Sequence, residues 1–162
     1  MLFRSAGSGS PHHLFAELFK SMTGTQATHV TYRGSVPALN DVVAGHIDFM
    51  FCDFASAIGM LQSNRVRPLG VTTAARIGAF PNIPPINESG VQGYNVAAWF
   101  MVVAPAKTPA PIVERLHREF KDILAAQDTN AQIANLSLLP MEMQPISAMQ
   151  TFVKSEIGRA HV

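Results

Sequence analysis

Apolar residues between positions 11 and 72 alternate between helical spacing and short continuous runs. The helical spacing predicts one helix from Pro11 to Gly24, a second from the turn at 33–35 to Gly45, and a third that begins after Asp53. The short runs predict strands at 28–32, 48–52 and 66–72. Because helix and strand alternate, the pattern favours an α/β fold with a mostly parallel sheet and helices on both faces.

The second half of the chain begins irregularly and becomes helical. Prolines at 80–94 predict irregular backbone apart from a turn at 86–89, and the apolar run at 96–105 predicts a strand buried on both faces. Thr108 and Pro109 predict the start of a longer helix, whose inward positions are Ile112, Val113, Leu116, Phe120, Ile123 and Leu124. The remaining predictions are a helix at 128–135 capped by Asp128, a strand at 138–143 and a last helix at 146–156.

The two ends, residues 1–5 and 157–162, are expected to be foreign to the gene. Codons that fit one end form the reverse complement of codons that fit the other, and both resemble a common sequencing adapter. Scars of this kind are set aside in fold reasoning. We therefore expect a gene fragment in which residues 6–97 form one lobe without its leading strand. Residues 98–156 then form the returning half of a second lobe, which is the less stable because its partner strands are missing.

Composition and charge exclude several classes of function. Hydrophobic residues make up 48% of the chain and charged residues 14%, which indicates a packed globular protein. The net charge is +1 and the basic residues are scattered, so no nucleic-acid partner is expected. No apolar run reaches the roughly 18 residues that a membrane span needs. The single cysteine, Cys52, excludes an internal disulfide and has no metal-ligand neighbour.

Three strand-to-helix turns carry the candidate chemistry. A helix start presents unpaired N–H groups and a partial positive charge, which suit a carboxylate or a phosphate. The first turn adds serine hydroxyls and glycines, the second adds an arginine, and the third adds an aspartate that accepts from a hydroxyl or an ammonium. The candidate ligand-binding residues are Ser8, Gly9, Ser10, Pro11, His12, Arg33, Gly34, Ser35, Asp53, Ala55 and Ser56. Ordinary helix capping is the alternative interpretation of each turn taken by itself.

Catalytic and metal-binding patterns are weak. His12 and His13 are adjacent, so on a helix they point about 100° apart and make a poor metal pair. The other histidines have no Ser, Asp or Cys partner at a telling spacing, and Cys52 is expected to be a buried thiol. This sparsity favours a binding protein without cofactor or metal over an enzyme.

Several motifs, taken in order and spacing, resemble a known family. They are the Gly/Ser-Pro-His loop before the first helix, YRGS at 32–35, AGHID at 44–48, FPxIP at 80–84 followed by ExG at 88–90, and PAxTP at 105–109. Over about residues 6–156 the chain resembles the Bug-type extracytoplasmic solute receptors of tripartite tricarboxylate transporters. The resemblance implies a two-lobed, periplasmic-binding-protein-like fold (type II, Venus-flytrap), incomplete here.

The resemblance also implies a function. A receptor of this kind closes on a small carboxylate, an organic acid or else an amino acid or aromatic acid, and holds it with backbone N–H groups and hydroxyls. It implies a periplasmic location, a transient handover to membrane permease subunits and a monomer when complete, with no catalysis. By matching position, the turns at 8–12, 33–35 and 53–56 line the cleft from one lobe.

The chain departs from the family pattern in three places. The first half-lobe, with its own glycine-rich loop and a nearby Asp, is missing. Met101 stands where a small residue is usual, and Cys52 and Asp53 stand where two polar residues are common. Two other functions remain as alternatives: the effector-binding domain of a two-lobed transcription regulator, and an enzyme that uses the loop at His12 and His13.

Overall fold

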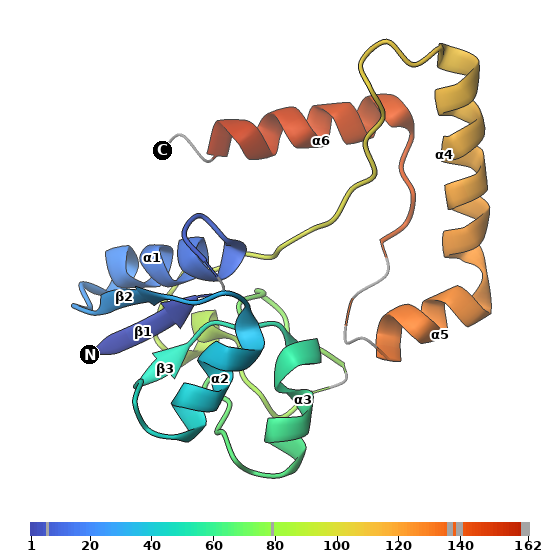
Figure 1. Cartoon of the computed structure of the whole chain (residues 1–162). Helices are drawn as coiled ribbons and strands as arrows, with labels where there is room; N and C mark the ends of the chain where they lie inside the picture. Colours follow the sequence, from blue (N-terminus) through green and yellow to red (C-terminus); the bar gives the residue numbers. More distant parts are fainter. Residues whose placement is uncertain (6, 79, 136–137, 139–140, 160–162) are drawn as a thin grey trace. The chain divides into compact units, whose positions relative to one another are not determined.

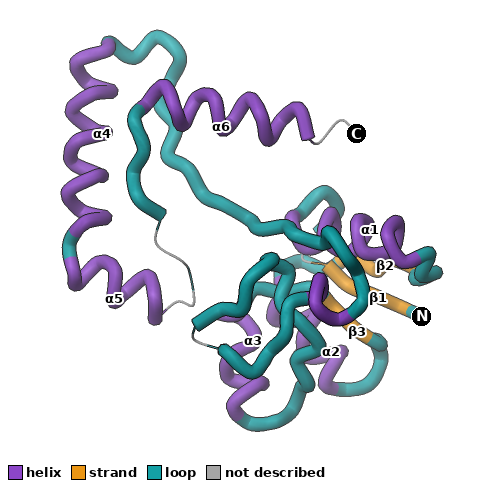
Figure 2. The backbone as a smooth tube through the Cα atoms, turned by 180° about the vertical axis from the view of Figure 1, so that it is seen from behind, coloured by secondary structure: helices purple, strands orange, loops and turns teal. Residues whose placement is uncertain are grey.

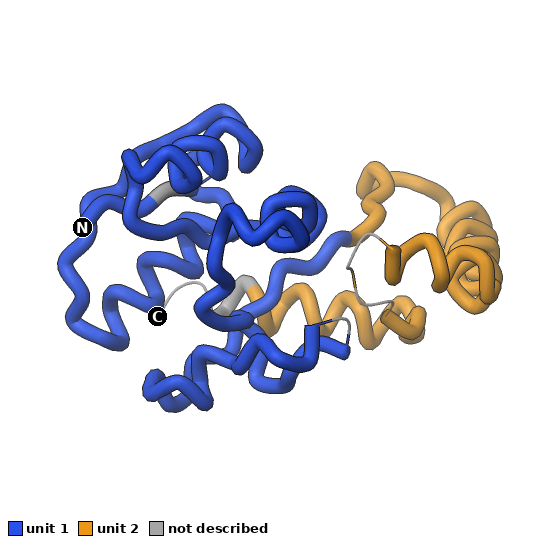
Figure 3. The backbone as a smooth tube through the Cα atoms, turned by 90° about the horizontal axis from the view of Figure 1, so that it is seen from below, with its two compact units in different colours: residues 1–100 blue, residues 101–162 orange. Residues whose placement is uncertain are grey.

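The computed structural model describes residues 1–5, 7–78, 80–135, 138 and 141–159 of the 162-residue chain. The chain divides into two compact units, residues 1–100 and residues 101–162 (Figure 3). The lobe boundary expected at 97/98 stays a prediction. No helix in these described stretches is both long and apolar enough to cross a membrane.

Within the described residues, the first unit is built on a three-stranded parallel sheet of order β2-β1-β3, formed by β1 (Leu2–Ser5), β2 (Thr28–Thr31) and β3 (Phe49–Met50). The chain leaves β1 toward β2 and later returns to add β3 on the other side of β1. Right-handed crossovers then require the connecting helices to lie on opposite faces of the sheet. Figures 1 and 2 show α1 on one face and α2 on the other.

The helices of the first unit begin and end at residues that the sequence marks. Helix α1 (Pro11–Thr23) has Ser10 as its N-cap and Gly24, with a φ of 67°, as its C-cap. Helix α2 (Ser35–Val43) follows Gly34, and helix α3 (Phe54–Gln62) follows the N-cap Asp53. These three helix predictions are confirmed. Ser35, however, is the first residue of α2 rather than its cap, and no side chain caps that helix.

The first strand corrects an expectation. Residues 1–5 were expected to be foreign to the gene and were set aside from the fold, and the lobe was expected to lack its leading strand. Instead β1 is the central strand of the sheet, and its Phe3 and Ser5 are fully buried. Phe3 stacks between His29 and Phe49, with ring centroids 4.9 and 5.9 Å away. A short segment with a large apolar side chain in register is enough to complete the sheet, whatever its origin, and that origin stays a prediction.

Of two further strand predictions in the first unit, one was too long and the other was wrong. β3 covers only part of the predicted 48–52, and the segment 66–72 forms an isolated parallel bridge between Val71 and Pro85 in place of a strand. The turn predicted at 86–89 is confirmed as a 3₁₀ helix, η1 (Ile86–Ser89). Arg76 holds the irregular segment by bonding the Pro81 carbonyl and the Glu88 carboxylate.

The core of the first unit lies between the sheet and its helices. Its buried apolar residues are Phe3, Ala16, Ala38, Leu39, Ile47, Ala57, Val71, Ile83 and Tyr94. Tyr94 is fully buried and donates its hydroxyl hydrogen to the Phe15 carbonyl at 2.9 Å. This bond ties the end of the irregular segment to α1.

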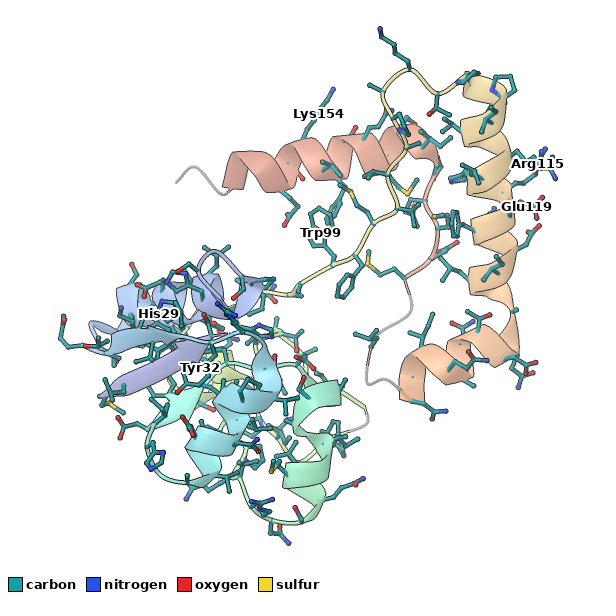
Figure 4. The ribbon with its side chains drawn as sticks, viewed as in Figure 1. His29, Tyr32, Trp99, Arg115, Glu119 and Lys154 are labelled. Atoms are coloured by element: carbon teal, nitrogen blue, oxygen red, sulfur yellow. The ribbon has the colours of Figure 1, made fainter. Side chains whose placement is uncertain are left out.

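The second unit is helical, with α4 (Ala110–Ala125), α5 (Gln127–Asn135) and α6 (Ile146–Arg159). Pro109, rather than Thr108, is the N-cap of α4, and Asp128 lies inside the first turn of α5 instead of capping it. Helix α6 extends past its predicted end at 156 into the segment expected to be foreign. Figure 4 shows Arg115 and Glu119 on the outer side of α4, where they form an exposed i,i+4 pair.

The strand predicted at 96–105 is absent. These residues have no regular structure, and Phe100 and Val103 expose 86% and 73% of their surface. The predicted strand at 138–143 falls partly outside the described residues, and its described positions are not in a strand. Among the described residues of the second unit none is buried, and the predicted inward positions Ile112 and Ile123 of α4 are about half exposed. A strand needs a neighbouring strand for its backbone groups, and among the described residues no strand pairs with 96–105, where the Val96 N–H bonds to the Thr72 carbonyl in an irregular stretch.

Candidate functional site

The candidate site lies at the carboxyl edge, which we define as the edge where β1, β2 and β3 end and helices α1, α2 and α3 begin (Figure 1). The chain order reverses at β1, since β2 lies on one side of it and β3 on the other. In open parallel sheets ligands bind at the carboxyl ends of the strands, at the point where the order reverses. The N-termini of α1, α2 and α3 therefore surround the position where this fold places a ligand.

Asp53 joins all three helices at this edge. Its Oδ1 accepts a 2.7 Å hydrogen bond from the backbone N–H of Ser56 and so caps α3. Its Oδ2 accepts from the Ser35 hydroxyl at 3.2 Å and lies 3.6 Å from Nε2 of His12. His12 comes from the first turn of α1 and Ser35 from the first turn of α2. Residues from three predicted turns, far apart in the sequence, thus meet at one carboxylate.

The pKa values at this carboxylate follow from burial and hydrogen bonding. Burial raises the pKa of Asp53, but hydrogen bonds from Ser56 and Ser35 outweigh it, so the pKa lies below its ordinary value. Burial lowers the pKa of His12, and the charge of Asp53 opposes that shift only in part. Near neutral pH the edge therefore carries an ionised aspartate beside an uncharged imidazole.

The loop before α1 is held from behind by side chains of β1, β2 and α1. Ser5 Oγ lies 2.7 Å from Nε2 of His29, and it accepts from the backbone N–H of Gly7 at 3.2 Å. The ring of His29 stacks on the ring of His13 with centroids 3.9 Å apart, and Nδ1 of His13 accepts from the Gly9 N–H at 3.1 Å. These contacts fix the position of the glycine-serine loop.

The other predicted site residues are distributed around this centre. Ser10 caps α1 by accepting from the His13 N–H, and Gly34, with a φ of 106°, makes the turn into α2. Ser8, Gly9, Pro11, Arg33 and Ala55 are exposed at the turns where they were predicted. Within the described residues Arg33 has no ion-pair partner. Whether these side chains touch a ligand stays a prediction.

Sequence reasoning missed the residues that support the loop. Ser5 was set aside with the end of the chain, and His29 was passed over because its partners Ser5 and His13 are far away in the sequence. Tyr32, labelled with His29 in Figure 4, donates to Asp41 Oδ2 at 2.6 Å and so ties the end of β2 to α2. The alternation of 28–32 was the available signal, since it places His29 on one face of a strand.

Cys52 differs from the expectation of a buried thiol. It is half-buried, and burial, helped by the neighbouring charge of Asp53, raises its pKa to about 11. The thiol therefore stays protonated and unreactive at neutral pH.

Comparison with known proteins decides the family. The model of the tripartite tricarboxylate transporter family receptor matches residues 1–161 of the chain. The chain belongs to this family. Its members are binding receptors, which agrees with the expectation of binding without catalysis and favours a receptor over a transcription regulator.

Relatives and solved structures extend the comparison. The chain is 39% identical over 158 residues to the UPF0065 protein in the tcbD-tcbE intergenic region of Pseudomonas sp. strain P51, covering 97% of this chain and 47% of that protein. It matches the structure of R. palustris Rpa4515 with adipate at a TM-score of 0.90 and 34% identity, covering 99% of this chain and 54% of that one.

Two further structures carry the names of binding proteins. MatC (Rpa3494) from Rhodopseudomonas palustris with bound malate matches at a TM-score of 0.85 and 28% identity, covering 98% of this chain and 55% of that chain. The structure of the periplasmic binding protein BugD matches at a TM-score of 0.84 and 27% identity, covering 98% of this chain and 54% of that chain. The two-lobed periplasmic-binding-protein fold, incomplete here, is thus confirmed, and the chain spans about half the length of the relatives named above.

Proposed function

We propose that the protein captures a small carboxylate in the periplasm and passes it to the membrane permease of a tripartite tricarboxylate transporter. The observation that carries the proposal is the meeting of α1, α2 and α3 at the carboxyl edge, where Ser35 and His12 both approach Oδ2 of Asp53. Helix N-termini favour anions through their free N–H groups and their dipoles.

The comparisons support a carboxylate in particular. One similar structure holds adipate and another holds malate, and both are dicarboxylates. The handover to permease subunits rests on the family description alone. A complete receptor also needs ligand contacts from a second lobe, so we expect this half-length chain to bind weakly.

The test is a titration of this chain with adipate and with malate, followed by the backbone amide signals of its NMR spectrum. Sodium chloride at matched ionic strength is the control. We expect dicarboxylate-specific shifts at the first turns of α1, α2 and α3, around residues 9–13, 35–38 and 54–57. Shifts that are equal in chloride and dicarboxylate, or that lie elsewhere, would contradict the proposal.

Two variants sharpen this titration. Arg33→Ala removes an exposed cation beside α2, so we expect about a two- to fivefold weaker dicarboxylate affinity, the range of an exposed ion pair. Arg67→Ala, which removes an exposed arginine beyond the end of α3, is the matched control and should leave the affinity unchanged. Equal dicarboxylate affinities of the two variants would mean that Arg33 does not contribute to ligand binding.

A further inference from the structure

Asp53 places a negative charge where the proposed function places an anion. Its hydrogen bonds keep the carboxylate ionised, and 42% of its side-chain surface is exposed at the carboxyl edge. Like charges at contact distance repel more strongly near a protein surface than in bulk water, because the effective dielectric constant is lower there. A dicarboxylate that binds against these helix N-termini therefore meets an opposing charge that must be neutralised.

His12 is the group placed to neutralise it. Its Nε2 lies 3.6 Å from Asp53 Oδ2, and its side chain is 20% exposed. Its Nδ1 is buried and, within the described residues, has no hydrogen-bond partner. A neutral imidazole offers one N–H donor, whereas the protonated ring offers two donors and a positive charge. A buried nitrogen without an acceptor disfavours the protonated ring in the free protein, and an anion placed against it would supply that acceptor.

The surroundings of His12 leave Asp53 as its charged neighbour. From α2 the Ser35 hydroxyl reaches the same carboxylate oxygen, and before α3 the Cys52 thiol is protonated. On α1 itself, His13 and Glu17 engage each other at 3.7 Å. Arg33 precedes α2, and its guanidinium is exposed. It does not contribute to the pKa shift of His12. The imidazole of a bound complex would therefore face two negative charges, the ligand carboxylate and Asp53.

We propose that His12 takes up one proton from solvent when a carboxylate ligand binds at the carboxyl edge, so that ligand affinity rises as the pH falls. This inference rests on the proposed function. Before binding, His12 is neutral and Asp53 is anionic. After binding, the imidazolium lies between two carboxylates, and the three groups share one net negative charge instead of two. Because the complex holds more protons than its parts, a lower pH favours the complex.

The pH window follows from the groups involved. The affinity should rise as the pH falls through the pKa that His12 has in the complex, and it should level off below the pKa of His12 in the free protein. The free value lies below the ordinary 6.5. Protonation of the ligand's own carboxyl groups sets the lower limit of the window.

The first measurement is the pKa of the His12 imidazole by NMR, in this chain with and without saturating malate or adipate. We expect the ligand to raise this pKa by about one unit, and the dicarboxylate affinity to tighten as the pH falls from about 8, approaching about a tenfold gain once the pH is well below the pKa of His12 in the free protein. His12→Asn keeps a polar side chain but cannot titrate, so it should remove the pH dependence. His46→Asn, which changes an exposed histidine beside Asp41 instead, should retain it.

Asp53→Asn separates this proposal from a general loss of the site. Asparagine still caps α3, but it removes the opposing charge, so we expect tighter dicarboxylate binding at pH 8. The ligand should still raise the pKa of His12, from a lower starting value, because Asp53 no longer raises it in the free protein. Dicarboxylate binding with an unchanged His12 pKa in the unaltered chain would overturn the proton uptake and leave the proposed function standing. The absence of edge-specific binding at every pH would overturn the proposed function, and this inference with it.

Discussion

At the residue scale, Asp53 has two structural roles and one electrostatic one. It caps α3 through Ser56, it holds Ser35 at the start of α2, and it faces His12 of α1. The sequence alone offered capping and ligand contact as alternatives for this residue. One carboxylate oxygen of Asp53 caps α3, and the other faces Ser35 and His12 at the carboxyl edge. Helix capping and ligand contact are therefore compatible roles for this residue.

The capping role predicts a specific loss of stability. Asp53→Ala removes the acceptor for the first turn of α3 and should lower the free energy of unfolding by about 1 kcal/mol. Asp53→Asn retains a capping oxygen and should cost much less. Urea denaturation at neutral pH measures both. Equal losses in the two variants would mean that charge, and not the cap, carries the stabilisation.

The same carboxylate should contribute to acid sensitivity. Because the pKa of Asp53 is lower in the folded chain than its ordinary 3.8, its stabilisation is present above pH 3.8 and is lost as the pH falls through the folded value. The loss of stability on acidification should therefore be smaller in Asp53→Asn than in the unaltered chain. Parallel urea curves at neutral and acidic pH test this, and identical losses would contradict it.

At the scale of elements, the helices of the first unit follow local signals. Ser10 and Gly24 mark the ends of α1 because the serine oxygen accepts a free N–H and the glycine adopts a left-handed φ of 67°. Strands followed local signals less well. The apolar run at 96–105 reads as a buried strand, but a strand forms only where neighbouring strands accept its hydrogen bonds.

Two glycines allow a matched test of these local signals. Gly24→Ala places a Cβ at a φ of 67° with no neighbour within 4 Å, so backbone strain alone should destabilise the chain by about 1–2 kcal/mol. Gly59→Ala lies inside α3, also with open space, and should stabilise it by about 0.5–1 kcal/mol. Thermal and urea denaturation compare them. If both variants are stabilised, or both are destabilised, backbone preference does not determine the stability of these two helices.

At the scale of the whole molecule, the two units differ in their cores. The first unit buries Phe3, Leu39, Val71 and Tyr94 around its sheet, whereas no described residue of the second unit is buried. Burial of apolar surface is the main stabilising contribution to folding, so the helices of the second unit are held mainly by their own hydrogen bonds.

This difference should be visible in amide hydrogen exchange. We expect the amides of α4 and α5 to exchange at least about tenfold faster than those of α1 and α2, because opening a helix without a core costs little. Mass spectrometry of peptides from each helix measures the rates. Equal protection in the two units would mean that the second unit gains stabilising contacts in solution.

The sequence by itself determined the α/β class, both ends of α1 and the starts of α2 and α3, the three turns that carry the candidate site, and the family. Each of these depends on neighbouring residues or on motifs read in order. Only the tertiary structure decided that residues 2–5 form the central strand, that 66–72 and 96–105 do not form strands, and that His12, Ser35 and Asp53 meet. Those outcomes depend on which distant backbone and side-chain groups become neighbours, and no local pattern contains that information.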